Sequence, residues 1–153
     1  MSKARIQYLT VEEMEYTALT LARKTMEWDE PIPDFSTRFP EVLERCLAAP
    51  QQTYQGELYS GLVPKAAILF YLLIKNHPFQ NGNKRIAVTA LLIFLIKNGE
   101  WLKLDNQQLY NFSKWVAESD PGVMEAVVQA IEKKLQDSLV KLPHFRIRYP
   151  KQK

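Results

Sequence analysis

The residues from Asn76 to Arg85 bring together side chains that could carry out chemistry. They read N-H-P-F-Q-N-G-N-K-R, with a histidine, a turn signal and two adjacent cations. On either side lie two of the most apolar segments of the chain, AAILFYLLIK and IAVTALLIFLIKNG, which are typical of buried helices. A loop that only connects two helices does not need these residue types. This loop is therefore the first candidate for a functional site.

The second half of the loop contains the parts of a phosphate-binding site. Asn81-Gly82 is a turn signal because both residues tolerate positive φ, and Asn83 is expected to cap the following helix. Lys84 and Arg85 then fall in its first turn, where cations are unfavourable unless an anion binds there. Free backbone N–H groups, a close approach at glycine and a bidentate guanidinium are typical of phosphate sites.

His77 precedes this site by a few residues. Pro78 is expected to hold His77 in an extended backbone conformation and to end the preceding helix. A neutral imidazole beside a bound phosphate could take a proton from an attacking hydroxyl group. The loop is not a Walker P-loop, because Arg85 stands where Ser or Thr would be needed for magnesium. A polar helix end, a turn and solvated cations would explain each residue alone, whereas their joint occurrence favours phosphate chemistry.

Helices are predicted to position this loop. Thr10 followed by Glu13 is a capping-box signature, Pro40 and Pro121 suit the first position of a helix, and Gly99 suits the position just after one. We predict an all-α fold, a compact bundle of about six helices, with a short extended flap or hairpin before the third. The expected helices cover residues 10–28, 40–49, 62–76, 84–98, 105–117 and 119–139.

Length and composition favour one domain without a membrane segment. A chain of 153 residues can bury a single core. Its longest apolar runs are shorter than the ~20 residues that a membrane-spanning helix needs. The single Cys46 cannot form an internal disulfide, and no basic-then-apolar leader opens the sequence, so we expect a cytoplasmic protein. Cys46 is expected to be buried, as free cysteines usually are.

Charge divides the chain into an expected helical domain, residues 1–139, and a basic tail, residues 140–153. The tail holds five of the 20 Lys and Arg and no acid, so the domain carries 15 Lys and Arg against 17 Asp and Glu. That balance disfavours nucleic acid as the partner of the domain. In the tail, HFRIRY alternates aromatic residues with arginines and could stack beside phosphates. A solubilising terminus or a docking segment for an acidic partner is the commoner explanation.

The nine residues from His77 to Arg85, HPFQNGNKR, resemble the hallmark loop of the Fic/Doc family. That loop reads His-Pro-Phe, two variable residues, Gly-Asn, then Gly or Lys, then Arg. The resemblance spans roughly residues 40–100 and agrees with the all-α prediction. Members with Gly-Asn-Gly-Arg usually transfer AMP from ATP to a target hydroxyl. Those with Asn-Lys-Arg resemble the death-on-curing toxins, in which the γ-phosphate is transferred and elongation factor Tu is a target.

The resemblance implies roles for the residues of the loop. His77 would be the general base, and Gly82 would form the anion hole. The ligands of the ATP phosphates would be Asn83, Lys84 and Arg85, and the last two would act with His77 in catalysis. The flap that would dock the target protein consists of Thr53, Tyr54, Gln55 and Gly56.

Asn81 departs from the family pattern. The family usually has Asp or Glu here, and that carboxylate holds the magnesium ion on the nucleotide. An amide is a neutral, weaker ligand for a hard cation. The resemblance therefore implies ATP and Mg²⁺ as cofactors, with Mg²⁺ bound more weakly at Asn81. Phe79 is expected to anchor the loop in the core.

The sequence also bears on partners. Some family members inhibit themselves through Ser/Thr, three residues, then Glu-Gly or Glu-Asn, and the nearest matches, residues 37–42 and 53–58, lack the final residue. We therefore expect a separate antitoxin chain. Three functions stay open: a Doc-like toxin that phosphorylates a Ser or Thr of a translation factor, an AMP-transferase of the same fold, and a non-catalytic module that binds a nucleotide or protein, which Asn81 favours.

Overall fold

The computed structural model describes residues 5–25, 28 and 30–142, and helices dominate this part of the chain. The first helical segment is continuous and comprises α1 (Val11–Glu13), a π-helical stretch (Met14–Ala18) and α2 (Leu19–Thr25). The others are α3 (Pro40–Ala48), α4 (Leu62–Lys75), α5 (Asn83–Lys97), α6 (Asn106–Glu118) and α7 (Met124–Ser138). These six helical segments confirm the predicted all-α bundle. No helix in the described ranges combines the length and apolarity needed to cross a membrane.

Side-chain caps begin two of the predicted helices, the first helix and α6. The Thr10 hydroxyl accepts from the backbone N–H of Glu13, whose carboxylate accepts from the N–H of Thr10. Asp105 and Gln108 form the same reciprocal cap at the start of α6. A short 3₁₀ turn, Pro121–Val123, precedes α7, so this helix begins slightly later than its proline indicated. Local capping chemistry thus fixes the start of the first helix and of α6, whereas α3, α4, α5 and α7 begin without a side-chain cap.

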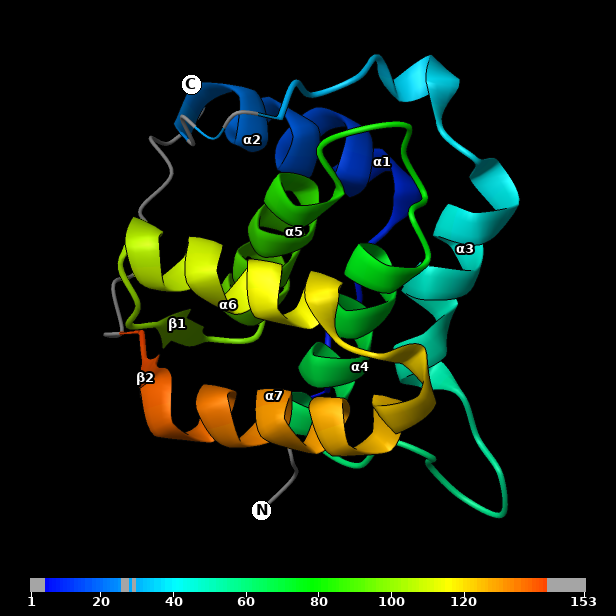
Figure 1. Ribbon diagram of the computed structural model, residues 1–153. Coiled ribbons are helices and arrows are strands. Elements are labelled where there is room, and N and C mark those ends of the chain that lie inside the picture. Colours follow the sequence, from blue (N-terminus) through cyan, green and yellow to red (C-terminus); the bar gives the residue numbers. More distant parts are fainter. Residues whose placement is uncertain (1–4, 26–27, 29, 143–153) are drawn as a thin grey trace, which may run out of the picture.

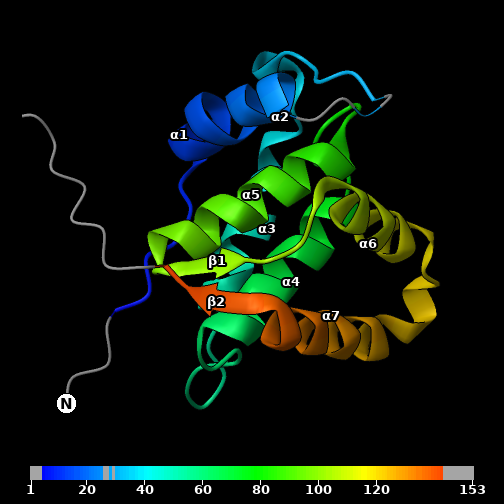
Figure 2. The ribbon, with the colours of Figure 1, turned by 90° about the vertical axis from the view of Figure 1, so that its left-hand side faces the viewer.

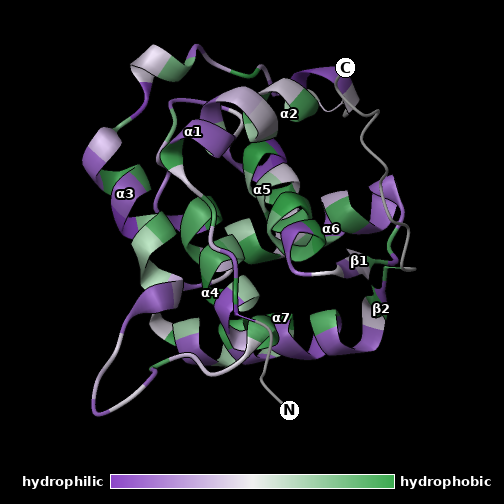
Figure 3. Cartoon of the chain, turned by 180° about the vertical axis from the view of Figure 1, so that it is seen from behind, coloured by the Kyte–Doolittle hydropathy of each residue, from purple (hydrophilic) through white to green (hydrophobic). Residues whose placement is uncertain are grey.

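The two most apolar helices, α4 and α5, pack against each other at the centre (Figures 1 and 2). α2 lies against α5 on one side, and α6 and α7 cover the other faces of the pair. Figure 3 shows hydrophobic residues along both central helices and polar residues on the outer helices. Because α4 and α5 are fixed by this core, the loop that joins them is held at both ends.

Two short strands complete the fold. β1 (Glu100–Leu102) pairs antiparallel with β2 (Leu139–Lys141), so that Trp101 lies opposite Val140. The sequence did not predict them, because three-residue strands are too short to show alternation. The expected boundary between the domain and the tail therefore falls inside β2. The rest of the predicted basic tail, residues 143–153, lies outside the described residues.

The predicted flap is a small exposed hairpin. Thr53 and Glu57 form one antiparallel bridge, and Gln55 and Gly56 turn the chain with φ of 52° and 117°. At the base of the hairpin, the N–H of Leu58 donates to the carbonyl of Gln52 at 3.0 Å. The extended flap is confirmed as a structural element that directly precedes α4.

Candidate active site

The loop between α4 and α5 lies beside the segment that follows α2 (Figures 1 and 2). Gly82 begins α5 in a left-handed conformation, with φ 71° and ψ 16°. A Cβ atom at this position would stand 2.8 Å from the carbonyl oxygen of Pro31, which is too close for any other residue. Gly82 is therefore required both for the turn and for the close approach of the segment.

Asn83 holds the loop closed instead of capping the helix. It is the first residue of α5, and the helix has no side-chain cap. Its Oδ1 accepts from the N–H of Phe79 at 3.0 Å, and its Nδ2 donates to the carbonyl of Phe79 at 2.9 Å. The predicted cap is therefore wrong, because Gly82 takes that position and the amide is used across the loop. Whether Asn83 also binds phosphate stays a prediction.

Phe79 anchors the loop in the core, as predicted. Its side chain is 1% exposed, and its ring lies 6.3 Å from the ring of Phe35 between centroids. Its neighbour Pro78 accepts a hydrogen bond from the N–H of Phe39 at 2.9 Å. These contacts fix the middle of the loop, so that the residues on either side of Phe79 are presented from a rigid base.

His77 projects from the loop into solvent-accessible space. Its φ is 50°, in the left-handed region, so the predicted extended conformation is wrong. The contacts of Pro78 and Phe79 turn the chain sharply after α4 and override the local preference of a residue before proline. The Nδ1 atom of the exposed imidazole lies 3.4 Å from Nδ2 of Asn83.

A cavity of about 160 Å³ opens at this loop. Its walls contain five of the predicted site residues together with Glu30, from the segment after α2, and Ala117, near the end of α6. The predicted residues in the wall are His77, Asn81, Gly82, Asn83 and Lys84. The fold thus brings the predicted base, the glycine and one of the two cations to one small space.

Lys84 forms an ion pair across this cavity. Its Nζ lies 2.6 Å from Oε1 of Glu30, and the two side chains are 24% and 36% exposed. Because the pair is partly buried, solvent screens it less than a surface pair. A phosphate that binds Lys84 must therefore share the ammonium group with Glu30 or displace that carboxylate.

Arg85 is not among the residues that line the cavity. Its guanidinium is buried and donates to the backbone carbonyls of Glu30 and Ala22. Burial lowers the pKa of Arg85, and the negative charge of Glu30 partly opposes this shift. Arg85 therefore joins α5 to the end of α2 and to the segment after it. Its predicted contact with phosphate stays a prediction.

Sequence reasoning missed the segment of residues 30–33. Besides Glu30 and Pro31, it includes Pro33, whose carbonyl accepts from Arg23 at 2.8 Å. The only sequence signal was an acidic residue in the proline-rich stretch WDEPIPD. Its contact with Lys84 spans 54 positions, and no local periodicity predicts a contact at that range.

The end of α6 is held against the loop from the other side. Lys75, in the last turn of α4, donates from Nζ to the carbonyls of Ala117 at 3.2 Å and Ser119 at 2.5 Å. A cation that bonds the last carbonyls of a helix satisfies them and favours its C-terminus. These bonds fix the wall that Ala117 contributes to the cavity.

The structure does not bring the predicted flap residues to the cavity. The flap precedes α4 and the loop follows it, so the 14 residues of α4, roughly 20 Å of helix, separate them. Figures 1 and 2 show the flap and the loop at opposite ends of α4. The role of Thr53 to Gly56 in docking a target stays a prediction. If they dock it, the target protein must contact the flap roughly 20 Å from the loop that carries His77.

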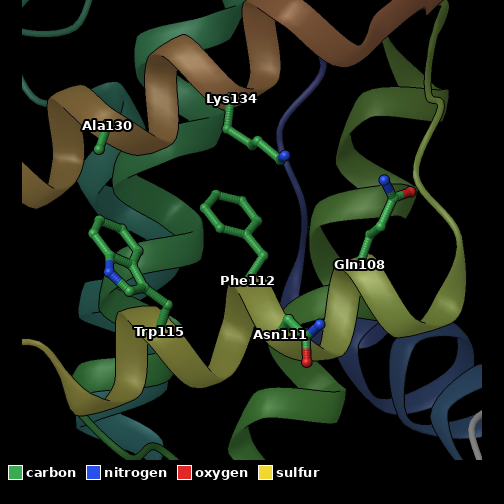
Figure 4. A pocket seen from close by; sticks show the side chains of 6 residues that line it. All are labelled: Gln108, Asn111, Phe112, Trp115, Ala130 and Lys134. Atoms are coloured by element: carbon green, nitrogen blue, oxygen red, sulfur yellow. The ribbon is translucent and has the colours of Figure 1, made fainter.

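A second cavity, of about 430 Å³, lies between α6 and α7 (Figure 4). Figure 4 shows that α6 contributes an aromatic pair, Phe112 and Trp115, and two amides, while α7 contributes Ala130 and Lys134. No predicted site residue lines this cavity. The chemistry-bearing residues are therefore concentrated at the loop between α4 and α5.

Part of this sequence is shared with known proteins. The curated Toxin Doc of Mycolicibacterium smegmatis (strain ATCC 700084 / mc(2)155) is 42% identical over 65 residues, which are 42% of this chain and 50% of that protein. The chain thus spans about half the length of that relative. No solved structure matches the chain. A sequence model of the Fic/DOC family matches residues 8–95, more than half of the chain and including the whole loop, and the protein therefore belongs to the Fic/DOC family.

Proposed function

We propose that this protein is a Doc-like toxin that transfers a phosphate from ATP to a Ser or Thr hydroxyl of a protein target. The observation that carries the proposal is that His77 and Lys84 line one small cavity at the start of α5. A base and a cation at a helix N-terminus are the parts that phosphoryl transfer needs. The name of the M. smegmatis relative supports the same proposal.

The cavity suits the phosphate end of ATP better than the whole nucleotide. Its volume of about 160 Å³ is smaller than the roughly 300–1,000 Å³ of pockets for drug-sized ligands. No side chain caps the start of α5, and the backbone N–H groups at a helix N-terminus favour the binding of an anion. Lys84 adds a positive charge within the same space. The γ-phosphate would therefore enter here while the adenosine lies outside the cavity.

The proposed reaction is a single displacement at the γ-phosphorus atom. An unprotonated ring nitrogen of His77 accepts the proton of the target hydroxyl as its oxygen forms a bond to this phosphorus. The bond between the phosphorus and the β–γ bridging oxygen breaks, and ADP leaves with that electron pair. Lys84 and the N–H groups of α5 stabilise the negative charge. Magnesium, when bound, neutralises and orients the phosphates.

Two alternatives carry a specific observation each. An AMP-transferase of the same fold is favoured by Pro78 and Gly82, which match the AMP-transferring pattern. A non-catalytic module that binds a nucleotide or a protein is favoured by Asn81, which lines the cavity without a negative charge. We prefer phosphate transfer because Lys84, which distinguishes the two patterns, lines the cavity rather than pointing away from it.

We further propose that the target is a translation factor such as an elongation factor, and that a separate antitoxin chain inhibits the protein. The support for the target is the resemblance of the Asn83-Lys84-Arg85 loop to the death-on-curing toxins, and the support for an antitoxin is the likeness to a protein named Toxin Doc. It would act in the cytoplasm, where translation factors are found.

The proposed function can be tested by mass spectrometry of a bacterial lysate incubated with the protein and ATP. We expect one protein of the lysate to gain a phosphate group on Ser or Thr. An AMP adduct would instead identify the AMP-transferase. No adduct of either kind, at protein concentrations that bind ATP, would leave the non-catalytic module as the better explanation.

A further inference from the structure

The cavity contains a carboxylate that does not come from the loop. Among the described residues that line it, Glu30 is the one with a carboxyl group. It lies in the segment after α2, more than 50 positions before Lys84. Position 81, where the family usually has this charge, carries an amide. The charge missing from the loop is thus present in the same cavity from another part of the chain.

One oxygen of this carboxylate is unused. Oε1 of Glu30 pairs with Nζ of Lys84 at 2.6 Å, whereas Oε2 is buried and has no hydrogen-bond partner in the described part of the chain. A buried oxygen without a partner is costly, and the cost is larger for a charged group. Such an atom needs an explanation, and a bound cation would satisfy it.

The position of Glu30 does not depend on its pair with Lys84. Its backbone carbonyl accepts from the buried guanidinium of Arg85, and the next carbonyl, of Pro31, packs against Gly82. Arg23 holds the end of the segment through Pro33. The backbone therefore keeps the carboxylate at the cavity, as the ligands of a preorganised site are kept.

We infer that Glu30 is the carboxylate ligand for the magnesium ion of the nucleotide, in place of residue 81. The inference rests on the proposed use of ATP. A phosphate and a carboxylate repel each other in a partly buried cavity unless cations lie between them, and Lys84 supplies one positive charge. Magnesium in nucleotide sites commonly takes one or two carboxylates, the phosphates and several waters. The side-chain oxygen of Asn81 can add a neutral ligand.

The test uses Mn²⁺ as the probe and a non-hydrolysable ATP analogue, and it measures binding instead of activity. Isothermal titration gives the affinity of the analogue with Mn²⁺ and in EDTA, and the ratio of the two is the readout. We expect Glu30→Gln, which keeps an oxygen to accept from Lys84, to lower this ratio at least about tenfold. The matched control is Glu41→Gln, on the surface of α3, where the side chain is 89% exposed. Its ratio should equal that of the wild type.

A second variant tests the same assignment by rescue. Adding Asn81→Asp to Glu30→Gln returns a carboxylate to the cavity from the loop. The double variant should therefore recover most of the wild-type ratio between the affinity with Mn²⁺ and the affinity in EDTA. If Glu30→Gln has the wild-type ratio, Glu30 is not a ligand. If it tightens binding equally with Mn²⁺ and in EDTA, Glu30 competes with phosphate for Lys84, and the inference is overturned. A wild type that binds no analogue under either condition overturns the proposed function and this inference together.

Discussion

Asn83 points its amide nitrogen at Nδ1 of His77 from 3.4 Å. The orientation of the amide is fixed, because its oxygen accepts from the N–H of Phe79 and its nitrogen donates to the carbonyl of the same residue. In the neutral imidazole, a donor that faces Nδ1 favours the tautomer with its proton on Nε2. The residue that closes the loop therefore also orients the predicted base.

This relationship predicts the tautomer of His77. Nitrogen NMR of the free protein, which has only two histidines, should show His77 with Nδ1 unprotonated in its neutral form. Asn83→Ala should lose this preference. It should also lower the free energy of unfolding by roughly 2–4 kcal/mol, since it leaves the buried N–H and carbonyl of Phe79 without partners. An unchanged tautomer in the variant would mean that Asn83 does not orient the ring.

Arg85→Ala should destabilise the free protein. The sequence alone suggests the opposite, because removing a cation from a helix N-terminus is favourable when no anion is bound. In the structure, however, Arg85 is 7% exposed and its guanidinium donates to two backbone carbonyls. We expect a loss of roughly 3 kcal/mol or more in urea unfolding. Arg45→Ala, on an exposed face of α3, should change stability by less than about 0.5 kcal/mol. Equal effects would contradict a structural role for Arg85.

Lys65 is predicted to hold the base of the flap. Its side chain is buried in α4, and its Nζ donates to the carbonyls of Pro50 at 3.1 Å and Tyr59 at 2.6 Å, on either side of the hairpin. Lys65→Met keeps the volume but leaves both carbonyls without this donor. Hydrogen exchange in the flap should become about tenfold faster or more, because one such bond is worth about 1.5–3 kcal/mol. Lys133→Met, at an exposed site on α7, is the control. An unchanged rate of hydrogen exchange in Lys65→Met would show that the flap does not depend on the hydrogen bonds of Lys65.

Cys46 should make stability depend on pH in the alkaline range. The thiol is fully buried, as expected, and burial raises its pKa to about 11. Between the unfolded pKa of 9.0 and this value, the unfolded thiol loses its proton while the native thiol keeps it. The stabilising contribution is complete below the lower value and is lost as pH rises through the higher one, about 2–3 kcal/mol in all. Cys46→Ala should lack this part of the pH dependence. If the free energy of unfolding changes with pH equally in the wild type and in Cys46→Ala from pH 9 to 11, the raised pKa of Cys46 is refuted.

The parts of the fold that follow from local chemistry were predictable from the sequence. The reciprocal cap of Thr10 and Glu13 and the position of Pro40 at the start of α3 depend only on neighbouring residues. The loop was predictable for the same reason, since its residue types and spacing lie within one short stretch. Phe79 was correctly placed in the core.

The remaining features depend on contacts between distant parts of the chain. Nothing near Glu30 indicates that it reaches Lys84, and nothing near Arg85 indicates that its charge is buried against α2. The strands β1 and β2 are too short to show a period and form because α7 ends beside the turn after α5. The separation of the flap from the cavity follows from the direction of α4, which sequence patterns do not give.

The central claim is that this loop transfers the γ-phosphate of ATP with His77 as the base. It is tested most directly by incubating a bacterial lysate with wild-type protein and ATP that is radiolabelled either at the γ- or at the α-phosphate. We predict that protein in the lysate gains the γ label and not the α label. His77→Ala should reduce the transfer by about 10²–10⁴-fold and Lys84→Gly should weaken it, while His77→Ala leaves the melting temperature nearly unchanged because the side chain is exposed. Transfer of the α label, or full activity of His77→Ala, would contradict the claim.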